Sequence, residues 1–172
     1  MDEGVPAKAA RRRFFSKMSL AILILIIIIA AAATGWWISR STSPIPDKIS
    51  SEVLFPLYYP ASLPAGYSID QNSFDLDNEV VVFGAKNSSG KTIAITEQPK
   101  PDNFDFDTFY SQHLSATKQV VTRSGNAVIG LMNTNPVASL ATDKTWVIVT
   151  FPANMPANNV EQTTESLTES GS

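Results

Sequence analysis

The side chains best suited to chemistry are few, and they lack the partners that catalysis needs. His113 is the only histidine, and no serine stands in a G-x-S-x-G setting that would pair with it as a nucleophile. The chain contains no cysteine, which excludes thiolate catalysis, disulfide bonds and cysteine-bound zinc. We therefore expect no catalytic residue, and we predict that the protein is not an enzyme.

Two acidic runs imitate the start of a calcium-binding loop. In the run that begins at Asp75, the sixth position is Val80 and the twelfth is Lys86, where such a loop has a glycine and a carboxylate. The run from Asn103 to Asp107 fails in the same way. A polar turn and a helix cap explain both runs, so the sequence predicts no metal site and no cofactor.

Charge separates the N-terminal end from the rest of the chain. After Arg40 there are seven basic and fourteen acidic side chains, and such an acidic surface repels the phosphate backbone of a nucleic acid. Nucleic-acid binding is therefore not expected. The basic cluster near the N-terminus is interpreted as a membrane-topology signal, and it consists of Arg11, Arg12, Arg13 and Lys17.

Residues 18–39 carry no charge and predict a transmembrane helix. At about 1.5 Å per residue, this run would cover roughly 30 Å of hydrocarbon. The positive-inside rule places the N-terminus in the cytoplasm and everything after Arg40 outside it, with Trp36 and Trp37 at the membrane interface. The small residues 30–33 also fit a cleavable signal peptide, and both alternatives export the remainder of the chain.

The chain is therefore expected to have five parts, in a single-pass protein of the bacterial cell membrane. A domain of about 100 to 120 residues has the usual size for one hydrophobic core. The parts are a cytoplasmic basic leader (1–17), a transmembrane helix (18–39), a polar Pro/Ser tether (40–52), an extracytoplasmic domain (53–168) and a disordered tail (169–172).

The segment FPLYYPASLPAGY, residues 55–67, contains three prolines four residues apart among bulky apolar side chains. The prolines exclude a helix interior and favour an extended chain. A docking peptide for an aromatic groove is the alternative, but its usual spacing is P-x-x-P. So much apolar surface is better buried, and we interpret the segment as the start of the folded domain, wrapped onto its core.

The remaining pattern predicts an α+β domain: an antiparallel, curved sheet with one or two helices packed on it. The helix at 104–115 has Asp105 or Asp107 as its expected N-cap. Helices are expected at 104–115 and 156–169, and strands at 67–74, 79–86, 91–97, 117–125, 126–133, 137–142 and 144–152.

The YYPASLPAGY start, the glycine-turned hairpin and the late Thr-Trp-Val-Ile strand resemble an uncharacterised extracytoplasmic domain of bacterial membrane proteins. That domain of unknown function often follows a single transmembrane helix, and its fold is similar to the curved sheets of lipoprotein-carrier proteins. The resemblance covers residues 55–168 and implies no catalytic residues. The 17 residues before the span are too few for the sigma-binding domain found in some of these proteins.

Two functions remain open. The first is a non-enzymatic, membrane-anchored binding or regulatory domain whose partner is an envelope protein, peptide or lipid. The sequence does not define the oligomeric state of the protein. The second is a carrier that holds a lipid or other apolar ligand on a concave sheet. The candidate ligand face of such a carrier comprises Val81, Phe83, Ile93, Ile95, Val147 and Val149.

Overall fold

The structure, a computed structural model, describes residues 43–171, which form one compact unit. The predicted leader and transmembrane helix lie outside these residues, as do Trp36 and Trp37. Within residues 43–171, no helix is both long enough and apolar enough to cross a membrane.

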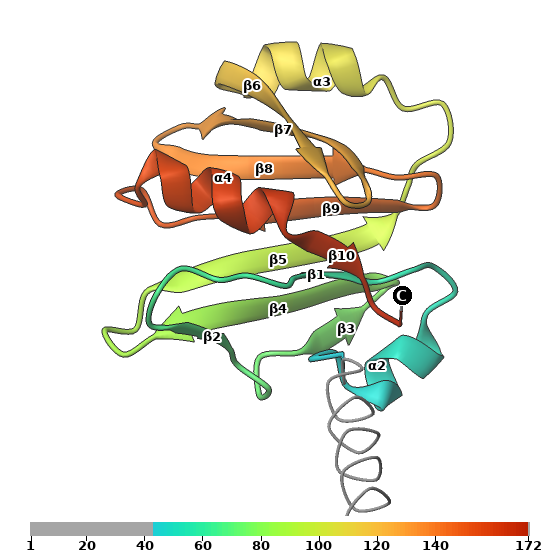
Figure 1. Cartoon of the computed structure of the whole chain (residues 1–172). Helices are drawn as coiled ribbons and strands as arrows, with labels where there is room; N and C mark the ends of the chain where they lie inside the picture. The colour runs from blue at the N-terminus through green and yellow to red at the C-terminus, as the bar shows by residue number, and fades with distance from the viewer. Residues whose placement is uncertain (1–42, 172) are drawn as a thin grey trace, which may run out of the picture. The chain divides into compact units, whose positions relative to one another are not determined.

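An eight-stranded antiparallel sheet forms the centre of the domain (Figure 1). Its main path runs β2-β4-β5-β9-β8-β7-β6, and β3 pairs with β4 beside β2. The strands are β2 (Tyr67–Ile69), β3 (Asp75–Asp77), β4 (Val80–Asn87), β5 (Thr92–Pro99), β6 (Ser115–Thr122), β7 (Gly125–Met132), β8 (Asn135–Ala141) and β9 (Thr145–Thr150). The structure thus confirms the predicted α+β class with an antiparallel sheet.

Alternation along the strands decides which side chains form the core. In β5, Ile93 and Ile95 point to one face while Thr92, Ala94 and Thr96 point to the other, as expected for a strand with a period of two. The register pairs Ile95 with Phe83 of β4 and with Val149 of β9, so the buried side chains of successive strands lie next to each other. The core therefore lies on one face of the sheet.

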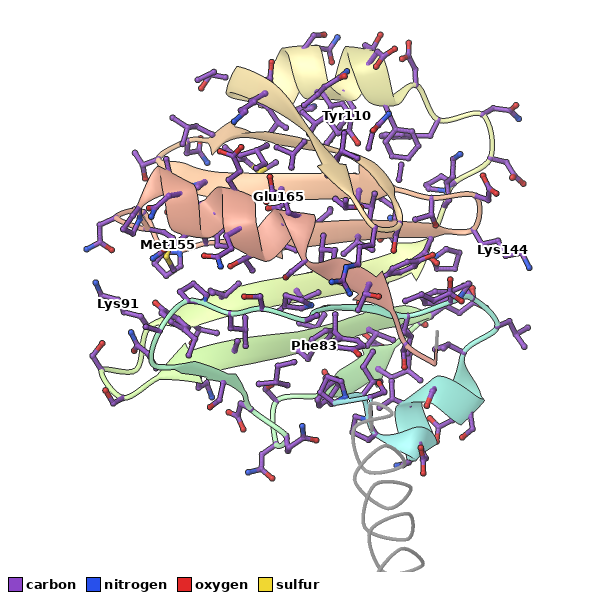
Figure 2. All side chains as sticks on the ribbon, in the orientation of Figure 1. Phe83, Lys91, Tyr110, Lys144, Met155 and Glu165 are labelled. Atoms are coloured by element: carbon purple, nitrogen blue, oxygen red, sulfur yellow. The ribbon has the colours of Figure 1, made fainter. Side chains whose placement is uncertain are left out.

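That core face is covered by segments from both ends of the domain. The two-stranded pair β1 (Tyr58–Pro60) and β10 (Leu167–Glu169) lies across it together with helix α4 (Ala157–Glu165), as Figure 1 shows. Leu57 and Tyr58 are buried there, and Phe83 lies between the sheet and this layer (Figure 2). The predicted wrapping of the segment 55–67 onto the core is confirmed.

Helix α3 (Phe106–His113) covers part of the opposite face. Asp105 caps it, since its side chain accepts a hydrogen bond from the Thr108 backbone N–H, as predicted. The Trp146 ring lies within 5.3–5.4 Å of three phenylalanine rings, and Tyr110 lies between α3 and the sheet (Figure 2). The phenylalanines are Phe104, Phe106 and Phe109.

Two predicted elements end four or five residues before the expected position. The strand expected at 67–74 ends at Ile69, because the Asp70 carboxylate accepts a hydrogen bond from the Asn72 N–H and turns the chain. The helix expected at 156–169 ends at Glu165. The residues that follow it form β10 and bond to β1 instead of continuing the helix or forming a tail.

The predicted tether is part of the domain. Residues 47–52 form a short helix, α2 (Asp47–Glu52), and the side chains of Ile45 and Ile49 are buried in the core. The compact unit therefore begins near Ser43 and not near Val53. Ile49 in the helix and Ile45 just before it are enough to attach this segment, because each buried side chain contributes about 1.5–3 kcal/mol.

Candidate functional site

The predicted apolar ligand face is the packed core of the domain. Its six side chains are between 0% and 1% exposed, and α4, β1 and β10 cover them. None of them lines any of five surface pockets of the described residues, which other side chains line. These positions are Val81, Phe83, Ile93, Ile95, Val147 and Val149. The packing gives the carrier alternative no cavity at this face.

The side chains that raised the question of chemistry are spread apart. His113 is in the last turn of α3, where its ring lies 4.8 Å from that of Phe109. Asp75 and Asp77 are exposed on β3. Within residues 43–171, no group of three or more acidic or histidine side chains is arranged to hold a metal ion.

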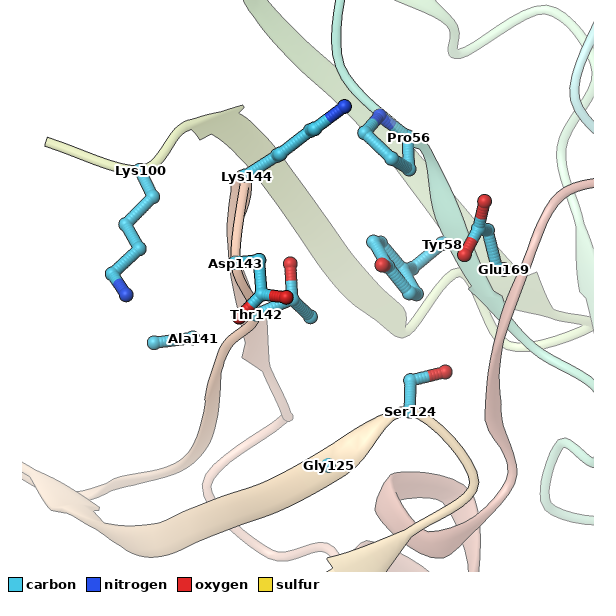
Figure 3. Close-up of a pocket in the computed structure, with 10 residues that line it drawn as sticks. All are labelled: Pro56, Tyr58, Lys100, Ser124, Gly125, Ala141, Thr142, Asp143, Lys144 and Glu169. Atoms are coloured by element: carbon cyan, nitrogen blue, oxygen red, sulfur yellow. The ribbon is translucent and has the colours of Figure 1, made fainter.

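A polar pocket instead lies at one end of the sheet and is called the Tyr58 pocket here (Figure 3). It encloses about 440 Å³. Four separate parts of the fold meet there: strand β1 with its partner β10, the end of β5, the β6–β7 turn and the β8–β9 loop. The lining residues are Pro56, Tyr58, Lys100, Ser124, Gly125, Ala141, Thr142, Asp143, Lys144 and Glu169.

Tyr58 is held in this pocket by bonds on its backbone. Its N–H donates to the Glu97 carboxyl at 2.9 Å, and the Pro56 carbonyl accepts from the Thr145 hydroxyl at 2.7 Å. The backbone pairing of Tyr58 with Glu169 of β10 fixes the other edge of strand β1. These contacts fix β1 against the sheet, so the phenol is placed by the fold and not by a flexible loop.

Charged side chains of both signs line the pocket together with Tyr58. Figure 3 shows Tyr58 between the loop that carries Asp143 and the strand that carries Glu169, with two lysines, Lys100 and Lys144, on the side of that loop. The Lys100 backbone N–H donates to the Lys144 carbonyl at 2.8 Å, which holds the two lysines side by side. Two lysines and two acidic residues thus line the same pocket as the Tyr58 phenol.

The Tyr58 phenol is a neutral hydrogen-bonding group. Burial raises its pKa above the usual value, the hydrogen bond to Thr142 lowers it in part, and the negative charges of Glu169 and Asp143 raise it further. A neutral phenol both donates and accepts hydrogen bonds. It can therefore bond either end of a polar ligand.

The second unusual group is Glu97, which lies on the core face of β5 and is 0% exposed. Its Oε2 atom accepts the Tyr58 N–H, while Oε1 has no hydrogen-bond partner within residues 43–171. Burial raises the pKa of this carboxyl well above its usual value, and the bond from Tyr58 opposes that rise only in part. The fold therefore favours a protonated carboxyl directly behind the pocket.

The pocket lacks the arrangement of a nucleophile and a base. The Ser124 hydroxyl donates to the Leu167 carbonyl at 3.5 Å, and the Ser124 N–H donates to Thr122. No histidine lines the pocket. Its side chains are suited to hydrogen bonding and ion pairing with a ligand.

Comparison with known proteins does not identify a relative. No protein-family model matches the chain, no curated protein matches it, and no solved structure matches it.

Sequence reasoning missed most of this pocket. Tyr58 was expected to be buried, but Lys100, Asp143 and Glu169 come from distant loops and strand ends that carry no periodic signal. Glu97 did leave a signal, since the alternation of Ile93 and Ile95 continues to residue 97 and predicts an inward side chain there.

Proposed function

We propose that the protein is a membrane-anchored, non-enzymatic binding protein that recognises its ligand in the Tyr58 pocket. In this proposal, residues 18–39 span the membrane and residues 43–171 lie outside the cytoplasm. The ligand is a small polar molecule, or the end of a peptide, that carries both an ammonium and a carboxylate group.

One observation supports this proposal most directly: Lys100, Lys144, Asp143 and Glu169 line the same pocket as the buried Tyr58. A volume of about 440 Å³ lies within the range of small-molecule sites, roughly 300–1,000 Å³. A ligand of one charge would face both attraction and repulsion here. A zwitterion presents opposite charges to the two lysines and to Asp143, and Tyr58 bonds it between them.

The test is calorimetric titration of the full chain, held in lipid nanodiscs, with three forms of one dipeptide. These are free alanyl-alanine, its N-acetyl form and its C-terminal amide. The free dipeptide should bind, and each blocked form should bind about tenfold more weakly, because each loses one charge-assisted hydrogen bond.

Tyr58→Phe should weaken the binding of the free dipeptide by a similar factor. Tyr59→Phe is the matched control, because Tyr59 is the next residue of β1 and does not line the pocket. Equal binding of all three peptide forms, or equal losses in the two tyrosine variants, would remove the Tyr58 pocket as the ligand site.

A further inference from the structure

The outer backbone edge of strand β6 has no strand partner among the described residues. Strand β6 is the last strand of the sheet, and within residues 43–171 it pairs only with β7. At the other edge, the outer side of β4 is already occupied by β2 and β3. Six of the eight β6 side chains are exposed, and Val121 is 77% exposed. Free strand edges are templates for pairing with another chain.

The register shows which backbone groups are free. Thr122 and Gly125 close a two-residue turn, and regular pairing with β7 continues back to Lys118. Hydrogen-bonded pairs recur at every second residue, so the N–H and C=O groups of Gln119 and Val121 point away from β7. Before Lys118 the register shifts, and Ala116 has a φ of 51°. The bulge limits a new strand to the regular stretch 118–122.

Both faces beside this edge are hollow. On the α4 face, a pocket of about 380 Å³ is lined mainly by apolar side chains, among them Ile129, Leu131 and Met155. On the α3 face, a pocket of about 390 Å³ is lined by polar groups that include Asp107 and Gln119. Successive side chains of a strand point to opposite faces. A strand added to β6 would therefore place alternate side chains in the two pockets.

The two pockets differ in the side chain they accept. Lys118 borders both, but its ammonium pairs with Glu161 of α4 at 2.6 Å. Asp107 forms no ion pair with any described residue, so the α3 pocket keeps an unbalanced negative charge. The apolar pocket suits a branched aliphatic side chain, and the α3 pocket suits a basic one.

We propose that β6 binds an extended peptide segment of a partner protein, in which aliphatic and basic residues alternate. The segment adds a strand to the sheet by backbone hydrogen bonds to Gln119 and Val121. Its aliphatic side chains enter the α4 pocket, and its basic side chains meet Asp107. Backbone bonds provide the affinity, and the two pockets provide the sequence preference. This proposal is independent of the Tyr58 pocket.

A second copy of this chain fits the edge poorly. On the α4 face, β6 carries Lys118, Val120 and Thr122, and the last two are already buried in their own domain. In a self-paired dimer, Lys118 of one copy would thus face the apolar pocket of the other copy, where Lys118 already lies at the rim. The acidic surface of residues 43–171 also favours a basic partner over an identical one.

The test uses the full chain in nanodiscs and a fluorescent octapeptide in which lysine and leucine alternate. It should bind about tenfold more tightly than a peptide of the same composition with its lysines and leucines in separate blocks. A peptide with glutamate in place of lysine should bind more weakly by a similar factor. Equal binding of the alternating and block peptides would overturn the proposal, as would equal binding of the glutamate peptide or no binding at all.

Two further comparisons isolate the backbone bonds. N-methylation of either all leucines or all lysines keeps the side chains, and only the set whose N–H groups face β6 should lose binding, by about tenfold or more. Val121→Pro removes an outward N–H from an edge strand, where proline is tolerated, and it should abolish binding, while Val121→Thr should not. If both N-methylated peptides bind as well as the parent, β6 pairing is wrong whether or not the proline variant folds. Val121→Pro could instead prevent dimerisation of the chain and leave peptide binding unchanged. That result would mean that the β6 edge binds a second copy of the chain.

Discussion

At the scale of single residues, Glu97 makes the stability of the domain depend on pH. The folded state holds the pKa of this carboxyl well above its usual value, whereas the unfolded chain does not. Between those two pKa values the folded state keeps a proton that the unfolded state has lost. The free energy of unfolding should therefore fall by up to about 1.4 kcal/mol per pH unit in this window, and level off above it.

Glu97→Gln tests this effect, because glutamine keeps an acceptor for the Tyr58 N–H but does not titrate. The variant should lose the fall in stability and become more stable than the wild type at alkaline pH. Urea unfolding between pH 5 and pH 9 measures both curves. A wild-type curve that the substitution leaves unchanged would show that another group is responsible. Asp70→Asn is a suitable control, since Asp70 forms a surface ion pair with Lys86.

At the scale of elements, one buried hydroxyl group helps to hold helix α3 on the sheet. Ser139 of β8 is buried, and its Oγ atom accepts the Trp146 indole N–H at 2.8 Å and lies 3.0 Å from the Tyr110 hydroxyl. Ser139→Ala leaves both partners without this bond and should lower the free energy of unfolding by about 1–3 kcal/mol. Amide hydrogen exchange should rise first in α3. Ser111→Ala, on the exposed side of α3, should leave both values unchanged.

The attachment of α2 gives a second prediction at this scale. Ile45 is 3% exposed, so Ile45→Ala should lower the free energy of unfolding by about 2–4 kcal/mol through lost burial and the cavity left behind. Leu54→Ala is the matched control, because Leu54 is 96% exposed. The free energy of chemical unfolding, measured for both variants, shows whether the folded domain begins near Ser43 or near Val53. Equal stability of the two variants would mean that residues 43–52 are a tether and not part of the folded domain.

The elements that the sequence predicted well are those with a local signal. Alternation in β4 and β5, and aromatic spacing with an aspartate cap in α3, are readable within a dozen residues. Strand β10 is different, because its three residues become a strand only by pairing with β1, more than a hundred residues earlier in the chain. The Tyr58 pocket has the same origin, since Lys100, Asp143 and Glu169 meet only in the folded chain.

At the scale of the whole molecule, the absence of cysteine allows a direct test of the predicted topology. Ser88 lies exposed in the turn between β4 and β5, and a single Ser88→Cys should react with a membrane-impermeant maleimide in intact cells. Ser16→Cys, in the predicted cytoplasmic leader, should react only after the cells are opened. Labelling of both positions, or of neither, in intact cells would contradict the proposed orientation.

The two ends of the described chain also lie together. The hydroxyl oxygens of Ser43 and Ser170 are 2.6 Å apart, and the Ser170 N–H donates to the Leu57 carbonyl. Joining residue 170 to residue 43 through a short glycine linker, and opening the chain between Ser88 and Ser89, should therefore preserve the fold. Circular dichroism and thermal unfolding of this permuted domain check the expectation. A permuted chain that fails to fold would mean that the closeness of the ends is not sufficient.

The same closure determines how the domain would respond to mechanical force. Strands β1 and β10 are antiparallel, and their first pair from the chain ends is Tyr58 with Glu169, followed by Tyr59 with Thr168 and Pro60 with Leu167. A pull on the two ends would first detach α2 and would then separate these pairs one after another, without loading the eight-stranded sheet in shear. Tyr58 and Glu169 are also walls of the pocket. Tension along the chain would thus open the pocket before it unfolds the sheet.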